Sequence, residues 1–272
     1  MAFTWLDLFK ACALGMVDGL TEFVPVSATG HLMLAQRFFG FADEGFGRSF
    51  AMLIRLGALM GLVSVYFSRL RHLVAGMSSD PAARRFVIGV LLAALPAAVV
   101  GALAHDVVEG MLLNIWLVCF AMIVGGAVLL WIDRLDLKPR RHEATGFSLP
   151  MYLGIGLAQC LALIPGVSRS GAAIVAAMWL GADRRAAAEF SLWLALPTLA
   201  GALGYDLYRG HAQLNLDGDT ALLAIGFAAA FVTAWCVVRT FLDYVARRGL
   251  ALFAWWRVIV GTLGLIALAL GR

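Results

Sequence analysis

Charged residues are scarce in this chain of 272 residues. Lysine, arginine, aspartate and glutamate make up only 14% of the sequence, whereas 62% of the residues are hydrophobic. A soluble domain carries about 25% charged residues, so the composition excludes a water-soluble globular protein. The sequence also lacks the clustered basic surface that nucleic-acid binding requires. We therefore expect an integral membrane protein with no nucleic-acid partner.

Cysteine is sparse as well, and its four copies stand far apart inside apolar segments. None belongs to a Cys-x-x-Cys pair or to a cysteine–histidine ligand pattern, so we interpret all four as small buried hydrophobic residues. A cleaved signal peptide is not expected, because Asp7, Asp18 and Glu22 interrupt the first apolar stretch.

Long apolar runs are abundant, and six of them can cross a bilayer, since a helical crossing takes roughly 20 residues. They fall at about 49–67, 86–104, 113–132, 187–204, 221–240 and 252–270. Two more apolar stretches, 11–39 and 150–180, are interrupted by PVSATGH at 25–31 and PGVSRSG at 165–171. Their arms, about 12–14 residues each, are too short to span. We expect two re-entrant helix–loop–helix hairpins.

The charges outside these runs alternate in sign along the chain. Basic residues follow crossings one, three and five: Arg69, Arg71, Arg84, Arg85, Arg134, Lys138, Arg140, Arg141, Arg247 and Arg248. Acidic residues follow crossings two and four: Asp106, Glu109, Asp206, Asp217 and Asp219, with Arg209 as the one basic residue. Basic loops stay in the cytoplasm. This pattern predicts a membrane protein with both termini outside the cytoplasm.

The two interrupted stretches align at an offset of 141, which pairs Val26-Ser27 with Val167-Ser168 and Asp18 with Gln159. Three crossings separate the copies, and an odd number inverts the second relative to the first. We therefore expect one membrane domain, 1–272, built from an inverted repeat of about 1–132 and about 150–272. The two loops would meet near the bilayer midplane, as in inverted-repeat transporters.

Few charges fall inside the membrane on this map, and such charges are functional candidates because they cost at least about 2.5–3.5 kcal/mol unless paired or hydrated. Asp18 and Glu22 are four residues apart, so their carboxylates share a helix face and either share a proton or bind a cation. The other exceptions are Arg55, Arg169 and Glu189. Arg239 and Arg257 lie near predicted cytoplasmic helix ends, where we expect them to extend to the interface.

The two polar loops supply groups that suit an anion. Ser168, Arg169 and Ser170 stand at an expected helix start, where free N–H groups, hydroxyls and a guanidinium favour phosphate. The alternative is helix capping combined with a salt bridge from Arg169 to Glu22. In the other loop Ser27 and Thr29 are phosphate contacts or helix caps, and His31 is a site residue or a buried core imidazole.

These motifs resemble those of the undecaprenyl-diphosphate phosphatases, bacterial membrane enzymes associated with bacitracin resistance. The resemblance rests on GMVDGLTEFVPVSATGHL at 15–32, FAMLIRLGAL at 50–59, QCLALIPGVSRSGAAI at 159–174 and EFSLWLALP at 189–197. It implies an enzyme that removes the terminal phosphate of undecaprenyl diphosphate at the outer face of the inner membrane. The product is the carrier lipid of peptidoglycan synthesis, and the resemblance also implies a divalent cation, Mg²⁺ or Ca²⁺.

Carried onto this sequence, the resemblance assigns the acidic metal motif to Asp18 and Glu22, and the family's histidine to His31. It assigns phosphate binding to the loop residues Ser168, Arg169, Ser170 and Gly171. Four positions depart from the family pattern: Asp18 replaces glutamate, Ala28 replaces the second serine of SSTGH, Arg55 replaces glutamine and Ala173 replaces threonine. Arg55 could pair with Asp18 or, like Thr29, contact phosphate.

The resulting hypothesis is metal-assisted phosphoryl transfer, with Glu22, Ser27, His31 and Arg169 as catalytic residues. The attacking group is Ser27 or a water aligned by Glu22 and His31, and His31 serves as base or proton donor. One alternative is a polyprenyl-phosphate transporter with weakened or lost hydrolysis. Another is an ion-coupled transporter of a small anion, which a closed polar cavity would favour. A homodimer is possible.

Overall fold

The structure is a computed structural model that describes residues 4–40, 46–112, 114–210 and 220–271. Over these ranges it is all helical, with no β-strand and one isolated bridge between Arg141 and Ala182. The helices are α1 (Trp5–Thr21), α2 (Ala28–Phe39), α3 (Phe46–Gly76), α4 (Pro81–Leu103), α5 (His105–Leu112), α6 (Ile115–Arg134), the short η1 (Ala144–Gly146), α7 (Leu149–Gln159), the short η2 (Cys160–Leu163), α8 (Arg169–Trp179), α9 (Arg184–Gly210), α10 (Thr220–Arg248) and α11 (Ala251–Ala269).

Six of these helices are long and apolar enough to cross a membrane, in agreement with the prediction. The candidate spans are Ser49–Gly76, Pro81–Leu103, Ile115–Arg134, Arg184–Tyr208, Thr220–Arg248 and Ala251–Ala269. Three of them are much longer than expected: α9 extends at both ends, and α3 and α10 continue to Gly76 and Arg248. Arg69 and Arg247 therefore lie on the last turns of helices and not in loops. Among the predicted acidic residues, Asp217, Asp219 and the side chain of Glu109 lie outside the described residues.

The two interrupted stretches form helix–loop–helix units, and their re-entry into the membrane stays a prediction. α1 begins at a capping box in which Thr4 and Asp7 each bond the other's backbone N–H. α7 begins after Ser148, whose side chain accepts a hydrogen bond from the backbone N–H of Met151. The breaks fall where the backbone is left-handed, at Ser27 with φ 74° and at Gly166 with φ 93°.

The first arm of each unit packs backbone to backbone against a distant helix. A Cβ added to Gly15 of α1 would collide with the carbonyl oxygen of Gly226 in α10. A Cβ on Gly156 of α7 would collide in the same way with the carbonyl oxygen of Ala93 in α4. Gly15 and Gly156 are aligned at the offset of 141. Small residues let helices approach closely where lipid supplies no hydrophobic drive, so these glycines fix both units in the bundle.

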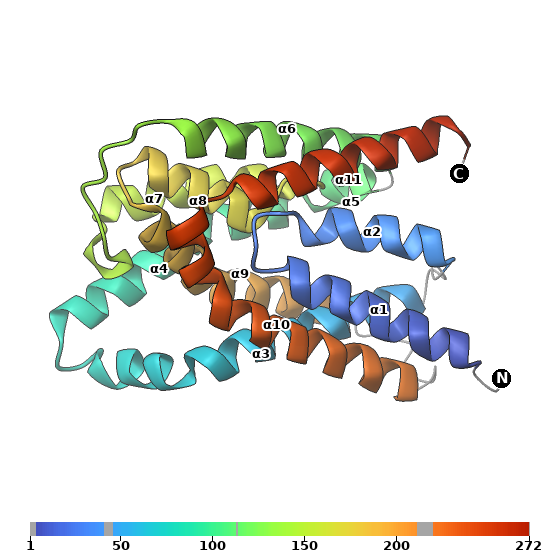
Figure 1. Ribbon diagram of the computed structural model, residues 1–272. Coiled ribbons are helices and arrows are strands. Elements are labelled where there is room, and N and C mark those ends of the chain that lie inside the picture. The colour runs from blue at the N-terminus through green and yellow to red at the C-terminus, as the bar shows by residue number, and fades with distance from the viewer. Residues whose placement is uncertain (1–3, 41–45, 113, 211–219, 272) are drawn as a thin grey trace.

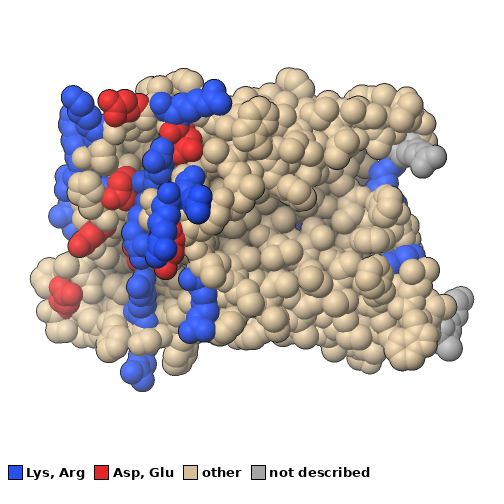
Figure 2. All heavy atoms as spheres, in the orientation of Figure 1, with Lys and Arg blue, Asp and Glu red and all other residues tan. Residues whose placement is uncertain are grey.

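The whole molecule is an elongated bundle with distinct ends. Both termini lie at one end, and the turn between α3 and α4 lies at the other (Figure 1). On the face drawn in Figure 2, most blue and red side chains gather at the end that holds this turn, a few blue ones lie at the opposite end, and a wide belt without charged side chains covers the middle. The six apolar helices and this distribution define a multi-pass membrane protein.

Candidate phosphate site

The two irregular loops touch each other directly. We call residues 22–27 loop one and residues 164–168 loop two. Ser170, just after loop two, donates a hydrogen bond from its hydroxyl to the carbonyl oxygen of Val24 at 2.8 Å. Arg169 donates from Nη2 to both the backbone oxygen and Oε1 of Glu22, each at 3.3 Å. Sequence segments more than 140 residues apart therefore build one site.

Loop one positions Ser27 in a strained backbone conformation. A positive φ is uncommon for serine and costs of order 1–3 kcal/mol, and such outliers cluster at functional sites. The Ser27 hydroxyl accepts the backbone N–H of Gly30 at 3.4 Å and so caps α2. Ser27 is only 3% exposed. Its side chain is therefore held at the first turn of α2, next to Ala28 and Thr29.

His31 is held at both ring nitrogens. Nε2 accepts the indole N–H of Trp256 at 2.7 Å, and Nδ1 lies 2.9 Å from the carbonyl oxygen of Ser27. Because the indole can only donate, Nε2 carries no proton, and Nδ1 is the nitrogen that donates to Ser27. The two rings are nearly parallel, with an interplanar angle of 7° and centroids 6.1 Å apart, as expected for rings joined edge to edge by this hydrogen bond. In this arrangement His31 braces the backbone of Ser27.

Loop two leads into α8 through a serine cap. The Ser168 hydroxyl accepts the backbone N–H of Gly171 at 3.1 Å and lies 3.1 Å from the hydroxyl of Ser170. The first turn of α8 follows at once, and a helix start favours anions through its free N–H groups. Arg169 also donates from Nη1 to the hydroxyl of Thr198 at 3.4 Å. No motif in the sequence pointed to Thr198.

A cavity of about 170 Å³ lies between the loops. Its polar lining combines the guanidinium groups of Arg55 and Arg169 with one carboxylate and three hydroxyls. Six of the predicted site residues line it: Glu22, Ser27, Thr29, Arg55, Ser168 and Arg169. The other four, Asp18, His31, Ser170 and Gly171, are not among its lining residues. Two cations against one carboxylate leave an excess of positive charge, which suits a polyanion.

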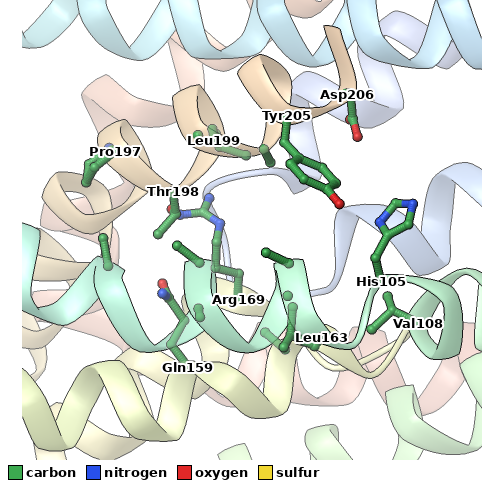
Figure 3. Close-up of a pocket in the computed structure, with 18 residues that line it drawn as sticks. His105, Val108, Gln159, Leu163, Arg169, Pro197, Thr198, Leu199, Tyr205 and Asp206 are labelled. Carbon is green, nitrogen blue, oxygen red and sulfur yellow. The ribbon is translucent and has the colours of Figure 1, made fainter. Parts of the chain in front are cut away.

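A second, larger cavity of about 410 Å³ adjoins the first and shares Ala162, Arg169, Leu199 and Ala202 with it. Its wall is mostly alanine, glycine and other apolar residues from α4 and α9. Figure 3 shows Arg169 reaching toward Thr198, and His105, Tyr205 and Asp206 grouped at the other end. Gln159 lines this cavity, is 2% exposed and has no hydrogen-bond partner for its amide atoms.

Asp18 lies fully buried one turn before Glu22 on α1. Neither of its carboxylate oxygens has a hydrogen-bond partner. A buried charge without a partner is costly, so such a group awaits a proton or a cation. No group of three or more His, Cys, Asp or Glu side chains comes together as a metal site within the described parts of the chain. Among side chains of these four types in the described residues, a cation here would thus have only the carboxylates of Asp18 and Glu22 as ligands.

Two other charged residues from the predicted crossings, Glu189 and Arg257, have partners in the structure. Glu189, one of the charges predicted to lie inside the membrane, pairs with the half-exposed Arg69 at 2.9 Å. The prediction that Arg257 extends to the membrane interface is wrong. Its side chain is buried, with 2% of the residue exposed, and it donates to backbone carbonyl oxygens in the protein interior. The direction of a side chain depends on helix packing, which sequence position alone does not give.

The fold and the site together define a class: a polytopic helical membrane protein with a polar, arginine-lined cavity between two helix-breaking loops. Residues 11–263 match the family described as "Bacitracin resistance protein BacA". The chain belongs to this family.

Relatives from several bacteria resemble the chain over nearly its full length. It is 62% identical over 266 residues to the undecaprenyl-diphosphatase of Rhodopseudomonas palustris (strain BisB18). The aligned residues cover 98% of this chain and 99% of the relative. It is 61% identical, with the same coverage, to the undecaprenyl-diphosphatase of Rhodopseudomonas palustris (strain BisA53). The protein of that name from Nitrobacter winogradskyi is 59% identical over the same shares.

Proposed function

We propose that this protein is an undecaprenyl-diphosphatase, which hydrolyses the terminal phosphoanhydride bond of undecaprenyl diphosphate. Water supplies the atoms that are added, and the products are undecaprenyl phosphate and inorganic phosphate. The observation that carries the proposal is the cavity between the loops, where Arg55, Arg169 and Glu22 converge. The names of the full-length relatives agree with it.

Arg169 and the start of α8 hold the phosphate to be transferred. A guanidinium presents parallel N–H donors that match phosphate oxygens. When substrate enters, the Glu22 carboxylate and the phosphate compete for the same donors of Arg169, now 3.3 Å from Oε1. Arg55 adds a second positive charge from α3, and Thr29 a hydroxyl from α2. These donors stabilise the negative charge that spreads over the phosphoryl oxygens during transfer.

The attacking oxygen is that of Ser27 or of a water molecule beside Glu22. Both groups line the same cavity, and the Glu22 carboxylate can accept the proton that the attacking oxygen loses. His31 braces Ser27 and, in this state, offers no free ring nitrogen to the cavity. A direct proton transfer by His31 requires it to release Trp256 or Ser27 first.

Asp18 and Glu22 are the residues that would hold a divalent cation. The unpartnered oxygens of Asp18 support this assignment. Two carboxylates completed by substrate phosphate oxygens are a typical donor set for Mg²⁺, whereas Ca²⁺ takes six to eight oxygens. When bound, the ion would neutralise charge on the diphosphate. The residues therefore fit Mg²⁺ better than Ca²⁺.

The adjoining apolar cavity would take the isoprenoid units nearest the diphosphate. Its alanine and glycine lining leaves space along α4 and α9, and it meets the polar cavity at Arg169. An apolar cavity beside the loops disfavours an ion-coupled transporter of a small anion. A polyprenyl-phosphate transporter is not favoured either, because the relatives are named as diphosphatases.

The protein would lie in the plasma membrane as an inverted repeat of about 1–132 and about 150–272 within one domain. The equivalent packing of Gly15 on α10 and Gly156 on α4 supports the repeat. The charged end would face the cytoplasm, with both termini and the entrance of the site on the outer side. The homodimer stays a prediction.

The test is phosphate release from undecaprenyl diphosphate by purified protein, with and without a chelator. We expect release that the chelator abolishes and that added Mg²⁺ restores. Transport of undecaprenyl phosphate into liposomes by protein that releases no phosphate would instead favour the transporter.

A further inference from the structure

Arg257 lies at the point where both loops meet helix α6. It is among the largest fully buried side chains in the described residues, and it comes from α11, outside both loops. We propose that Arg257 is a positioning residue, which holds loop one and loop two in the relative arrangement that phosphoryl transfer requires. The proposal rests on the proposed phosphatase function.

The guanidinium donates to four carbonyl oxygens from three separate segments. Nη1 donates to Pro25 in loop one at 3.3 Å, and Nη2 to Gly166 in loop two at 3.0 Å. Nη2 also donates to Ala121 at 3.3 Å, and Nε donates to Met122 at 3.2 Å. One planar group thus ties both loops to α6. Only arginine presents enough donors in a rigid fork to do so.

The two loop contacts are equivalent in the repeat. Pro25 and Gly166 are separated by 141 residues, the same offset that aligns Ser27 with Ser168. Each carbonyl lies two residues before the serine that caps the following helix. Arg257 therefore fixes matching peptide groups just before Ser27 and Ser168, which line the same cavity.

The surroundings leave room for this one side chain. A Cβ added to Gly125 of α6 would collide with Nη2 of Arg257, and one on Gly171 would lie 3.2 Å from Nη1. The four partners are backbone oxygens, which carry no net charge and do not neutralise the guanidinium. Its positive charge therefore also adds to the electrostatic potential that an entering diphosphate meets. A buried charge is costly to desolvate. A contact needed only for packing would not require this charge.

The experiment compares the purified full-length proteins Arg257→Met and Arg257→Lys with wild type, using undecaprenyl diphosphate and Mg²⁺. The control is Arg239→Met, because Arg239 lies 4.3 Å over the ring of Trp235 on α10, away from the loops. A shift of about 1 Å in reacting groups can cost roughly 100-fold in rate. We expect kcat to fall at least about 30-fold in Arg257→Met, with KM changed less than about threefold. Arg257→Lys should be intermediate and the control unchanged.

Amide hydrogen exchange provides a second readout that does not depend on activity. In Arg257→Met, peptides covering 22–31 and 164–171 should exchange faster, while peptides from α3 and α10 keep wild-type protection. If Arg257→Met does not fold, Gly125→Ala replaces it in both measurements. This variant retains Arg257 but shifts its guanidinium, because the added methyl group would collide with Nη2.

Three results would overturn the proposal: unchanged kcat in Arg257→Met, loop exchange equal to wild type, or faster exchange throughout the protein with normal kcat per folded molecule. If wild type itself releases no phosphate, the proposed function fails. The loop exchange would then still show whether Arg257 orders the loops.

Discussion

Arg169 connects the parts of the site more directly than its motif alone could indicate. It bonds Glu22 across the two loops, reaches Thr198 on α9 and borders both cavities. Its side chain is 17% exposed and that of Glu22 is 8% exposed. Breaking a buried ion pair by removing one partner typically costs about 3–5 kcal/mol. Removing either partner would therefore leave the other charge buried without its counterpart.

The first prediction concerns the geometry of that guanidinium. Arg169→Lys keeps the charge but loses the parallel donors, so we expect kcat/KM for undecaprenyl diphosphate to fall by about 100-fold or more. Steady-state phosphate release measures this. Arg239→Lys serves as the matched control and should remain within about twofold of wild type. Near-normal activity in Arg169→Lys would mean that charge alone suffices.

The second prediction concerns Ala28, where the family pattern has serine. Ala28 lines the polar cavity beside Ser27, so a hydroxyl at position 28 would enter the same space. Because Ser27 already supplies a hydroxyl there, we expect Ala28→Ser to change kcat less than about threefold. A gain of tenfold or more would contradict this and show that the missing serine limits hydrolysis.

The third prediction tests the cation assignment through Asp18. Asp18→Asn removes one of the two carboxylates, so the Mg²⁺ concentration for half-maximal activity should rise about tenfold or more. Thermal stability should not fall, because neither carboxylate oxygen of Asp18 has a hydrogen bond that the substitution could remove. An unchanged Mg²⁺ requirement would remove Asp18 from the metal site.

At the scale of residues, the motifs indicated which side chains come together, and residues outside the motifs were missed. Glu22 and Arg169 were expected at one site, and the structure brings them into contact, as the alternative of helix capping with a salt bridge also predicts. Thr198 carries no local signal, because it is one hydroxyl in an apolar helix. Arg257 was placed at the interface, since counting along a helix gives depth but not the direction in which a side chain points. The contacts of His31 depend on Trp256, which is 225 residues away.

At the scale of elements, the sequence predicted which segments form membrane-spanning helices better than it predicted how long those helices are. Hydropathy marks where a helix leaves the apolar layer, but a helix such as α3 or α10 can continue into water on arginine-rich turns. The two breaks were predictable because Pro, Gly and Ser cluster there. The close contact of α1 with α10 was not, since Gly15 has many possible partners.

This contact gives the fourth prediction. Gly15→Ala places a methyl group against the Gly226 carbonyl, so we expect a loss of about 1–3 kcal/mol despite the better helix propensity of alanine. In contrast, Gly204→Ala on α9 meets nothing within 4 Å and should be neutral or stabilising by up to about 1 kcal/mol. Thermal unfolding in detergent compares the two. Equal effects would contradict the close packing of α1 on α10.

The distribution of charge predicts orientation at the scale of the whole molecule. In a variant without native cysteines, Ser79→Cys in the turn between α3 and α4 should react only with a membrane-permeant maleimide in spheroplasts. Gly271→Cys, at the end with the termini, should react with an impermeant one. The reverse pattern would invert the topology and place the basic end outside the cytoplasm.

The central claim is that this one site hydrolyses the terminal phosphoanhydride of a lipid diphosphate. Hydrolysis of undecaprenyl diphosphate in H₂¹⁸O, with mass analysis of both products, tests it most directly. The account predicts ¹⁸O in the inorganic phosphate and none in undecaprenyl phosphate, whether Ser27 or water attacks first. It also predicts that Arg169→Lys slows release of the label. Label in the lipid product, or no inorganic phosphate from the wild-type protein, would contradict the account.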